Sequence, residues 1–252
     1  MRNDSSGFTL IELMVSMAVA SIMMAAIYAS FQSQVQSHMT QQEVVGMNQN
    51  ARAVLFLMER EIRLAGTDPT GSSGAGIIAA TSSYLHFDRD ITGGETDSVD
   101  NDHDGTPDDP DEWYNGRADD PTEEIEYQLT NDADNDGIAD GFPCGLGRQV
   151  SGAGGFAVVA GNIEALNFVY RDAAGNVIAT PVSPANLDNI RSIQVTIIAR
   201  TDSPVMMRRT TDTSVYTNQQ GTTVLDLSAN ADKVRRYLLT TEIRCRDLGL
   251  KS

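Results

Sequence analysis

The chain has 252 residues and a formal net charge of −17 at pH 7. Residues 88–140 hold 20 Asp or Glu against two arginines, a net of −18, which leaves +1 for the rest of the chain. Because binding to nucleic-acid phosphates relies on clustered Lys and Arg, this balance argues against direct nucleic-acid binding. The length suits one domain with an insertion behind an N-terminal segment.

The N-terminus contains an apolar segment, residues 8–31, in which Glu12 is the only charged residue. As a helix this segment would be about 36 Å long, enough to cross a hydrocarbon core about 30 Å thick. A secretory signal peptide has its cleavage site after the apolar core, whereas here the candidate cleavage position, Gly7, precedes it. Cleavage there would keep the helix, so we expect a single-pass membrane protein anchored by its N-terminus.

The segment GFTLIEL, residues 7–13, resembles the processing site of the type IV pilin-like superfamily. The resemblance implies that a prepilin peptidase cuts between Gly7 and Phe8 and N-methylates Phe8. It also implies that Glu12 is the assembly carboxylate, paired with the Phe8 amine of a neighbouring subunit. A carboxylate at the centre of a spanning helix costs roughly 2.5–3.5 kcal/mol, less near an end, and marks a function by default. The alternative is a plain signal anchor with Glu12 in the headgroup layer.

Helical signals continue beyond the apolar segment. One amphipathic stripe has three- and four-residue spacing: Val44, Met47, Ala51, Val54, Leu55, Met58 and Ile62. Gly66 and Pro69 are stop signals, which predicts one helix over about residues 8–65, or two helices broken near Gly46. Residues 50–66 resemble the helix end of PilW-type minor pilins and of J-type type II secretion pseudopilins. We interpret the charged residues there as exposed helix surface with local ion pairs: Glu59, Arg60, Glu61 and Arg63.

After Pro69 the pattern changes to strands and turns. Alternation predicts strands at 84–87, 124–129, 190–200 and 234–245, and a hairpin joining 163–170 to 177–178. The fold class predicted is α+β: a long N-terminal α-helix, its first half transmembrane, packed on an antiparallel β-sheet head. The expected parts are a leader (1–7), a pilin helix (8–66, membrane span 8–31) and a head (67–252) with an acidic insert (88–142). Residues 161–170, 190–201 and 240–250 resemble late strands of PilW-type proteins.

The acidic insert repeats the pattern D-x-D-x-D-G-x-x-D. Alternating carboxylates around a turn glycine suit Ca²⁺, which takes six to eight oxygen ligands, so the sequence predicts two Ca²⁺ sites. The first site uses Asp100, Asp102, Asp104 and Asp108, with Asp111 or Glu112 as closing ligands, and the second uses Asp132, Asp134, Asp136 and Asp140. Because the closing glutamate of an EF-hand is missing, the loops resemble dockerin or thrombospondin type 3 repeats. Glu123 or Glu124 is then a candidate remote ligand for either loop. The alternative is a solvated acidic loop.

Cysteines and histidines give weaker signals. Cys144 and Cys245 lie in the part expected outside the cytoplasm, where a disulfide could form between them. His38, His86 and His103 show no zinc-site spacing. Neither the nucleophile motif G-x-S-x-G nor the phosphate-binding motif G-x-x-x-x-G-K-[ST] occurs, so we expect a protein that is not an enzyme.

These resemblances imply a PilW-like minor pilin that initiates type IV pilus assembly and lies at the pilus tip. Its expected partners are the prepilin peptidase, the inner membrane, and other minor pilins and the major pilin through the N-terminal helix. Its head would be periplasmic, and on the cell surface after assembly. One alternative is a J-type pseudopilin at the tip of the type II secretion pseudopilus. The other is a calcium-dependent pilus adhesin in which the acidic insert and Trp113 contact a receptor.

Overall fold

The computed structural model describes residues 9–91, 105–106, 116–118, 123–150, 154–202, 211–246 and 248. The chain divides into two units, one ending at Val44 and one starting at Val45. The predicted leader, Gly7 and Phe8 lie outside the described residues, as do the ligands predicted for the first calcium loop: Asp100, Asp102, Asp104, Asp108, Asp111 and Glu112.

A single helix, α1 (Leu10–Ile62), runs through both units without a break at Gly46. The predicted long helix is therefore confirmed, slightly shorter at both ends than expected. After Ile62 the backbone tightens, with Leu64 N donating to Glu61 O at 3.0 Å and Ala65 N donating to Ile62 O at 3.1 Å. The turn ends at Gly66, whose φ of 76° lies in the left-handed region that glycine adopts most easily.

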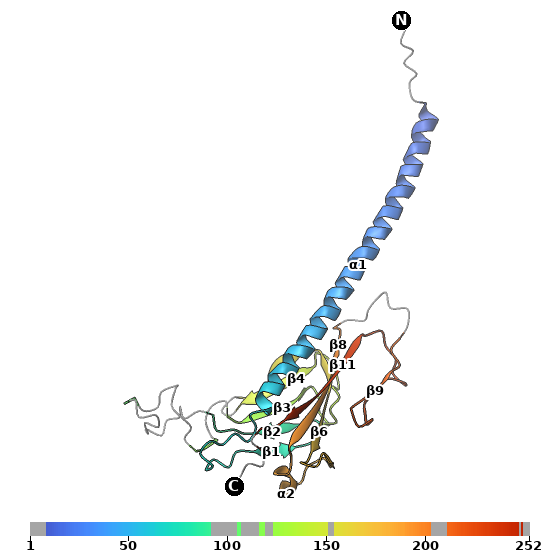
Figure 1. Ribbon diagram of the computed structural model, residues 1–252. Helices are drawn as coiled ribbons and strands as arrows, with labels where there is room; N and C mark the ends of the chain where they lie inside the picture. The colour runs from blue at the N-terminus through green and yellow to red at the C-terminus, as the bar shows by residue number, and fades with distance from the viewer. Residues whose placement is uncertain are drawn as a thin grey trace. The chain divides into compact units, whose positions relative to one another are not determined.

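The head contains a five-stranded antiparallel sheet with the order β1-β2-β3-β4-β5. Its strands are β1 (Ile77–Ala80), β2 (Leu85–Phe87), β3 (Ile125–Thr130), β4 (Gly145–Val150) and β5 (Ala157–Gly161). In β3 the buried residues Ile125, Tyr127 and Leu129 alternate with half-buried polar ones. The last turns of α1 lie against the buried side of this sheet (Figure 1), and the polar side chains of β3 point the other way.

A second sheet has four antiparallel strands in the order β11-β8-β6-β7. Its strands are β6 (Ile163–Arg171), β7 (Val177–Ile178), β8 (Ser192–Arg200) and β11 (Arg236–Arg244), and the short helix α2 (Pro184–Leu187) precedes β8. All of β8 is buried. A two-stranded hairpin, β9 (Val215–Thr217) and β10 (Thr223–Asp226), packs Val224 and Leu225 against Ala165 and Ile198 of this sheet.

The chain crosses between the two larger sheets at Asn162, the one residue that separates β5 from β6. Its φ of 59° turns the backbone there. The α+β prediction is confirmed as a long apolar helix with an antiparallel head, although the head has more than the single sheet expected. Strand β3, which lies within residues 88–142, is the central strand of the five-stranded sheet.

Candidate functional site

At the start of α1, Thr9 and Glu12 form a reciprocal capping box. Thr9 N donates to Glu12 Oε2 at 2.9 Å, Thr9 Oγ1 donates to the same oxygen at 2.8 Å, and Glu12 N donates to Thr9 Oγ1 at 3.3 Å. This arrangement satisfies backbone donors that have no partner within a helix. Glu12 therefore lies in the first turn of the apolar helix, and its described contacts are within its own chain.

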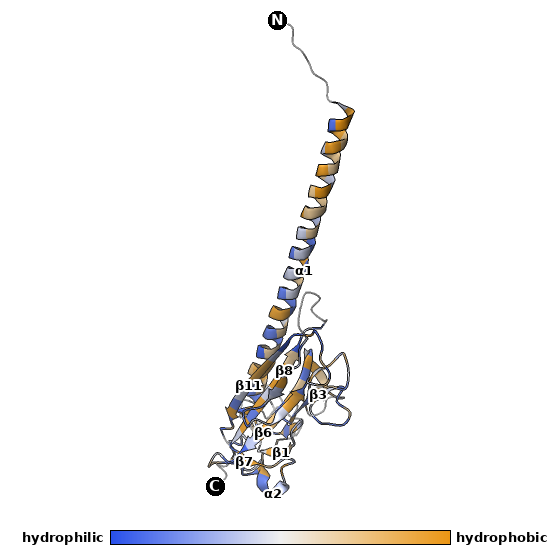
Figure 2. Cartoon of the chain, turned by 90° about the vertical axis from the view of Figure 1, so that its right-hand side faces the viewer, coloured by the Kyte–Doolittle hydropathy of each residue, from blue (hydrophilic) through white to orange (hydrophobic). Residues whose placement is uncertain are grey.

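The first half of α1 exposes large apolar side chains on all sides, including Leu10, Met14, Ile22 and Phe31. Figure 2 shows hydrophobic residues predominating here and polar residues entering in the second half of the helix. Among the described residues, α1 is the helix that is long and apolar enough to cross a membrane. A helix that is apolar all round is stable where lipid or other apolar helices surround it.

In the second half of α1, Glu61 is buried against the five-stranded sheet. Arg148 of β4 donates to both carboxylate oxygens of Glu61, from Nε at 2.9 Å and from Nη2 at 2.7 Å, and the Tyr127 hydroxyl donates to the same carboxylate. Burial, together with the Glu61 charge, raises the pKa of the Tyr127 phenol. The interpretation of Glu61 as exposed surface is wrong, whereas Glu59 does form the local ion pair expected with Arg63.

The second predicted calcium loop brings three carboxylates together. Oxygens of Asp132, Asp134 and Asp136 all lie within 4.8 Å of one another. Gly137 N donates to Asp132 Oδ2 at 3.0 Å, and Ala133 N donates to Asp140 Oδ2 at 2.7 Å. Partial burial, with the nearby Asp136 charge, raises the pKa of Asp132. Converging, mutually repelling carboxylates are a donor set that fits a hard cation such as Ca²⁺.

Hydrogen bonds connect this loop to β6 and to the turn between β1 and β2. Leu166 N donates to Gly137 O at 2.9 Å, Ala139 N donates to Glu164 O at 2.9 Å, and Ser83 Oγ donates to Asn135 O at 2.7 Å. Gly137 has a φ of 88°, and a Cβ there would lie 2.5 Å from Leu166 O. The close approach explains why the loop needs glycine at this position, and it connects the loop directly to β6.

The remote ligands considered for the second loop, Glu123 and Glu124, lie at the opposite end of β3. The six residues of β3 span about 20 Å between them and Asp132. Glu123 instead accepts from Ile91 N at 2.7 Å, and Glu124 pairs with His86. As ligands of the second loop, Glu123 and Glu124 are therefore a wrong prediction. For the first loop they remain a prediction.

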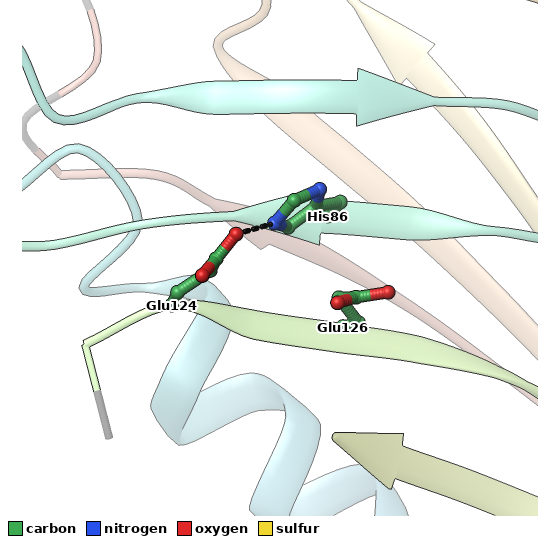
Figure 3. A group of neighbouring side chains, drawn as sticks. All are labelled: His86, Glu124 and Glu126. Atoms are coloured by element: carbon green, nitrogen blue, oxygen red, sulfur yellow. Dashed lines mark hydrogen bonds and ion pairs between the residues drawn. The ribbon is translucent and has the colours of Figure 1, made fainter. Parts of the chain in front are cut away.

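A side-chain cluster that the sequence analysis missed lies on β2 and the start of β3. His86 Nε2 contacts Glu124 Oε1 at 2.7 Å, and ligand atoms of His86, Glu124 and Glu126 all lie within 4.8 Å of one another (Figure 3). The Tyr84 hydroxyl donates to Glu126 Oε2 at 2.6 Å. Burial and this hydrogen bond raise the pKa of Tyr84. Strands 84–87 and 124–129 were both predicted, so pairing them would have placed these side chains together.

The two cysteines are buried and free. Cys144 lies at one end of the four-stranded sheet, because its O accepts from Asn162 N and Asn162 O accepts from Arg200 N at the end of β8. Cys245 lies at the other end, because its N donates to Arg191 O just before β8 begins. Strand β8 separates these ends by about 26 Å, whereas a disulfide needs Cα atoms within about 7 Å. The disulfide left open by the sequence is therefore excluded in this fold. Burial raises the pKa of the Cys144 thiol to about 11.

Residues 2–28 match the family model for the prokaryotic N-terminal methylation motif, a range that contains Gly7, Phe8 and Glu12. No curated protein matches the chain in sequence. Among solved structures, a type IV-like pilin from Thermus thermophilus is similar at 12% identity and a TM-score of 0.48. That similarity covers 80% of this chain and 96% of the other. The motif match agrees with the methylation site that the sequence predicts at Gly7 and Phe8.

Proposed function

We propose that this protein is a minor pilin that takes part in initiating type IV pilus assembly. The proposal rests on the methylation motif at residues 2–28, which leads directly into the exposed apolar half of α1. When the cleavage site precedes the apolar helix instead of following it, the helix stays in the mature protein. It can lie in the inner membrane before assembly and pack among the helices of other pilins afterwards. The role is structural and involves no chemical reaction after processing.

The position of Glu12 suits a role in subunit pairing. Both contacts from Thr9 are made to Oε2 of Glu12. The other oxygen, Oε1, can therefore accept from the Phe8 amine of a neighbouring subunit without breaking the helix cap. Such a pair would neutralise the carboxylate in lipid, where an unpaired charge is costly. A neighbouring pilin that offers a processed N-terminus would thus be selected over other membrane helices.

Calcium ordering of the head is part of the same proposal. Bound Ca²⁺ would neutralise the carboxylates of Asp132, Asp134 and Asp136 and so hold the loop between β3 and β4. Because this loop is bonded to β6, the cation would also stabilise the junction of the two larger sheets. The matching pattern at Asp100 to Asp108 supports a second, similar site.

The assembly role is tested in a deletion strain complemented with wild type, Glu12→Ala or Glu43→Ala. Glu43 is the next acidic residue on α1 and serves as a matched control. Electron microscopy of pili and an exoprotein secretion assay are read side by side. We expect loss of pili with normal secretion, restored by wild type and Glu43→Ala but not by Glu12→Ala. Lost secretion with normal pili would instead assign the protein to the type II secretion pseudopilus.

The calcium role is tested by calorimetric Ca²⁺ titration of the full chain in detergent micelles. Wild type should bind two ions per chain, and Asp102→Asn and Asp134→Asn should each lose one. The exposed Asp226, outside both loops, supplies the control variant Asp226→Asn. Absence of Ca²⁺ binding, or unchanged stoichiometry in both loop variants, would refute this part of the proposal.

A further inference from the structure

The cluster of His86, Glu124 and Glu126 lies on the face of the five-stranded sheet opposite α1. His86 of β2 and Glu126 of β3 are direct cross-strand partners in the sheet register. Glu124 stands two residues before Glu126, so its side chain projects to the same face. Strand pairing, rather than a flexible loop, therefore brings one imidazole and two carboxylates to one place.

The distances between the three ligand groups suit a small cation. His86 Nε2 and Glu124 Oε1 are 2.7 Å apart, and one ligand atom from each of the three side chains lies within 4.8 Å of the other two. Figure 3 shows the His86 ring facing Glu124, with the Glu126 carboxylate beside them. In a tetrahedral zinc site, bonds of about 2.0–2.2 Å place ligand atoms roughly 3.3–3.6 Å apart. Small side-chain rotations would give that spacing.

The chemistry of the ligands distinguishes this cluster from the aspartate loops. Ca²⁺ prefers oxygen ligands alone, whereas an imidazole nitrogen with two carboxylates suits Zn²⁺ and related divalent transition metals. The two glutamates also carry more negative charge than one histidine can balance. Pairing of His86 with Glu124 uses only one of the two carboxylates, and the strand register places the second, Glu126, beside the same imidazole.

Surrounding contacts hold the ligands and leave them accessible. The Tyr84 hydroxyl donates to Glu126 Oε2 at 2.6 Å, which orients that carboxylate as outer hydrogen bonds do in metal sites. The side chain of His86 is 14% exposed and that of Glu124 is 37% exposed. An ion can therefore enter from solvent while the histidine stays held between strands.

We propose that His86, Glu124 and Glu126 form a binding site for one divalent transition-metal ion, with Zn²⁺ as the expected occupant. Three protein ligands leave the fourth position of a tetrahedral ion to water or to a side chain of another subunit. The site is separate from the proposed Ca²⁺ loops, and it ties β2 to β3 on the face that α1 does not cover. It goes beyond the assembly role, which does not depend on it.

The test is a calorimetric Zn²⁺ titration of the full chain in detergent micelles, with Ca²⁺ in excess so that the aspartate loops are occupied. Wild type should bind one Zn²⁺ per chain, and Co²⁺ in its place should give the visible absorption of a tetrahedral site. His86→Gln and Glu126→Gln should each weaken binding tenfold or more. Tyr84→Phe, which keeps every ligand, should weaken it by about tenfold through loss of the orienting hydrogen bond.

His38→Gln is the matched control, because His38 is an exposed histidine on α1, and it should bind like wild type. Where His86→Gln or Glu126→Gln fails to fold, Zn²⁺ binding is measured in Tyr84→Phe and in Glu124→Gln, whose substituted side chain is more exposed, and both should bind Zn²⁺ more weakly than wild type. The proposal is overturned if wild type takes up no Zn²⁺, or if His86→Gln and Tyr84→Phe bind as tightly as wild type. Zn²⁺ uptake that is lost in Asp134→Asn but kept in His86→Gln would also overturn it. None of these outcomes bears on processing or pilus assembly.

Discussion

The two halves of α1 have the same secondary structure and opposite surroundings. Before Val44 its apolar side chains are exposed on all sides, as at Ile11 and Met24. After Val45 one stripe is buried in the head, including Met47, Ala51, Val54, Met58 and Ile62. Because both halves are helical, helix propensity does not explain why one is exposed and the other is buried. The second half is stabilised by packing within its own chain, whereas the first half needs a membrane or neighbouring helices to cover it.

The two carboxylates in these halves follow the same division. Glu61 is satisfied inside its own chain, by Arg148 and Tyr127. Among the described residues, the hydrogen-bond partners of Glu12 belong to Thr9, at the start of the helix that the pair caps. The comparison therefore predicts that substitutions in the second half change the stability of the head, while substitutions in the first half change assembly and leave the head intact.

The largest effect is expected at Glu61. Glu61→Ala removes a buried charge and leaves Arg148 without its carboxylate, which should destabilise the head by about 3–5 kcal/mol. Glu59→Ala, which breaks only the exposed pair with Arg63, should cost a few tenths of a kcal/mol. Denaturant unfolding of the full chain in micelles measures both. Equal effects of the two substitutions would contradict the buried role of Glu61.

A smaller effect is expected from deleting apolar contacts. Met58 is fully buried, so Met58→Ala should destabilise the head by about 2–5 kcal/mol. Met14 is 62% exposed, and Met14→Ala should leave the unfolding of the head unchanged. The same unfolding experiment separates them. A comparable loss in Met14→Ala would show that the first half of α1 also packs within its own chain.

The smallest effects are expected at two glycines, one with a positive φ and a crowded Cβ position and one in an open position within a helix. Gly66 has a φ of 76°, and a Cβ there would meet the Leu248 side chain, so Gly66→Ala should cost about 1–2 kcal/mol. Gly46 lies within α1 with nothing within 4 Å of an added Cβ. Gly46→Ala should therefore stabilise the chain by about 0.5–1 kcal/mol. Thermal unfolding gives the sign of each change, and a destabilising Gly46→Ala would indicate that α1 bends there.

Much of the difference between the two halves of α1 could be predicted from the sequence, because it depends on local patterns. The stripe from Met47 to Ile62 has helical periodicity, and this predicted which side chains the head would bury. The run ending at Phe31 is apolar throughout, and its side chains are exposed as such a run predicts for a segment outside the head. The burial of Glu61 could not be predicted, because its partner Arg148 lies on β4. Two glycines in β4 hide its strand pattern, and Gly145 is required there since a Cβ would lie 2.5 Å from Ala160 O.

The two candidate metal sites also differ in whether the sequence alone could predict them. The candidate Ca²⁺ ligands of the aspartate loop at residues 132–140 lie within a few residues of one another, so their spacing alone predicts the loop as a candidate site. The His86 cluster depends on the register of β2 with β3, which brings together residues far apart in the chain. The predicted strand at 124–129 already separates Glu123 and Glu124 from this loop by the length of a strand, so their exclusion as its ligands could have been drawn from the sequence.

The central claim is that the chain is processed at its N-terminus and then held by the apolar half of α1. The most direct measurement is mass spectrometry of the N-terminal peptide, after expression with a prepilin peptidase and isolation from membranes. We predict a chain that begins at Phe8 and carries one methyl group on its α-amine, and a Gly7→Leu chain that stays uncut. A wild-type chain that still begins at Met1, or one cut beyond Phe31 so that the apolar helix is lost, would contradict the account.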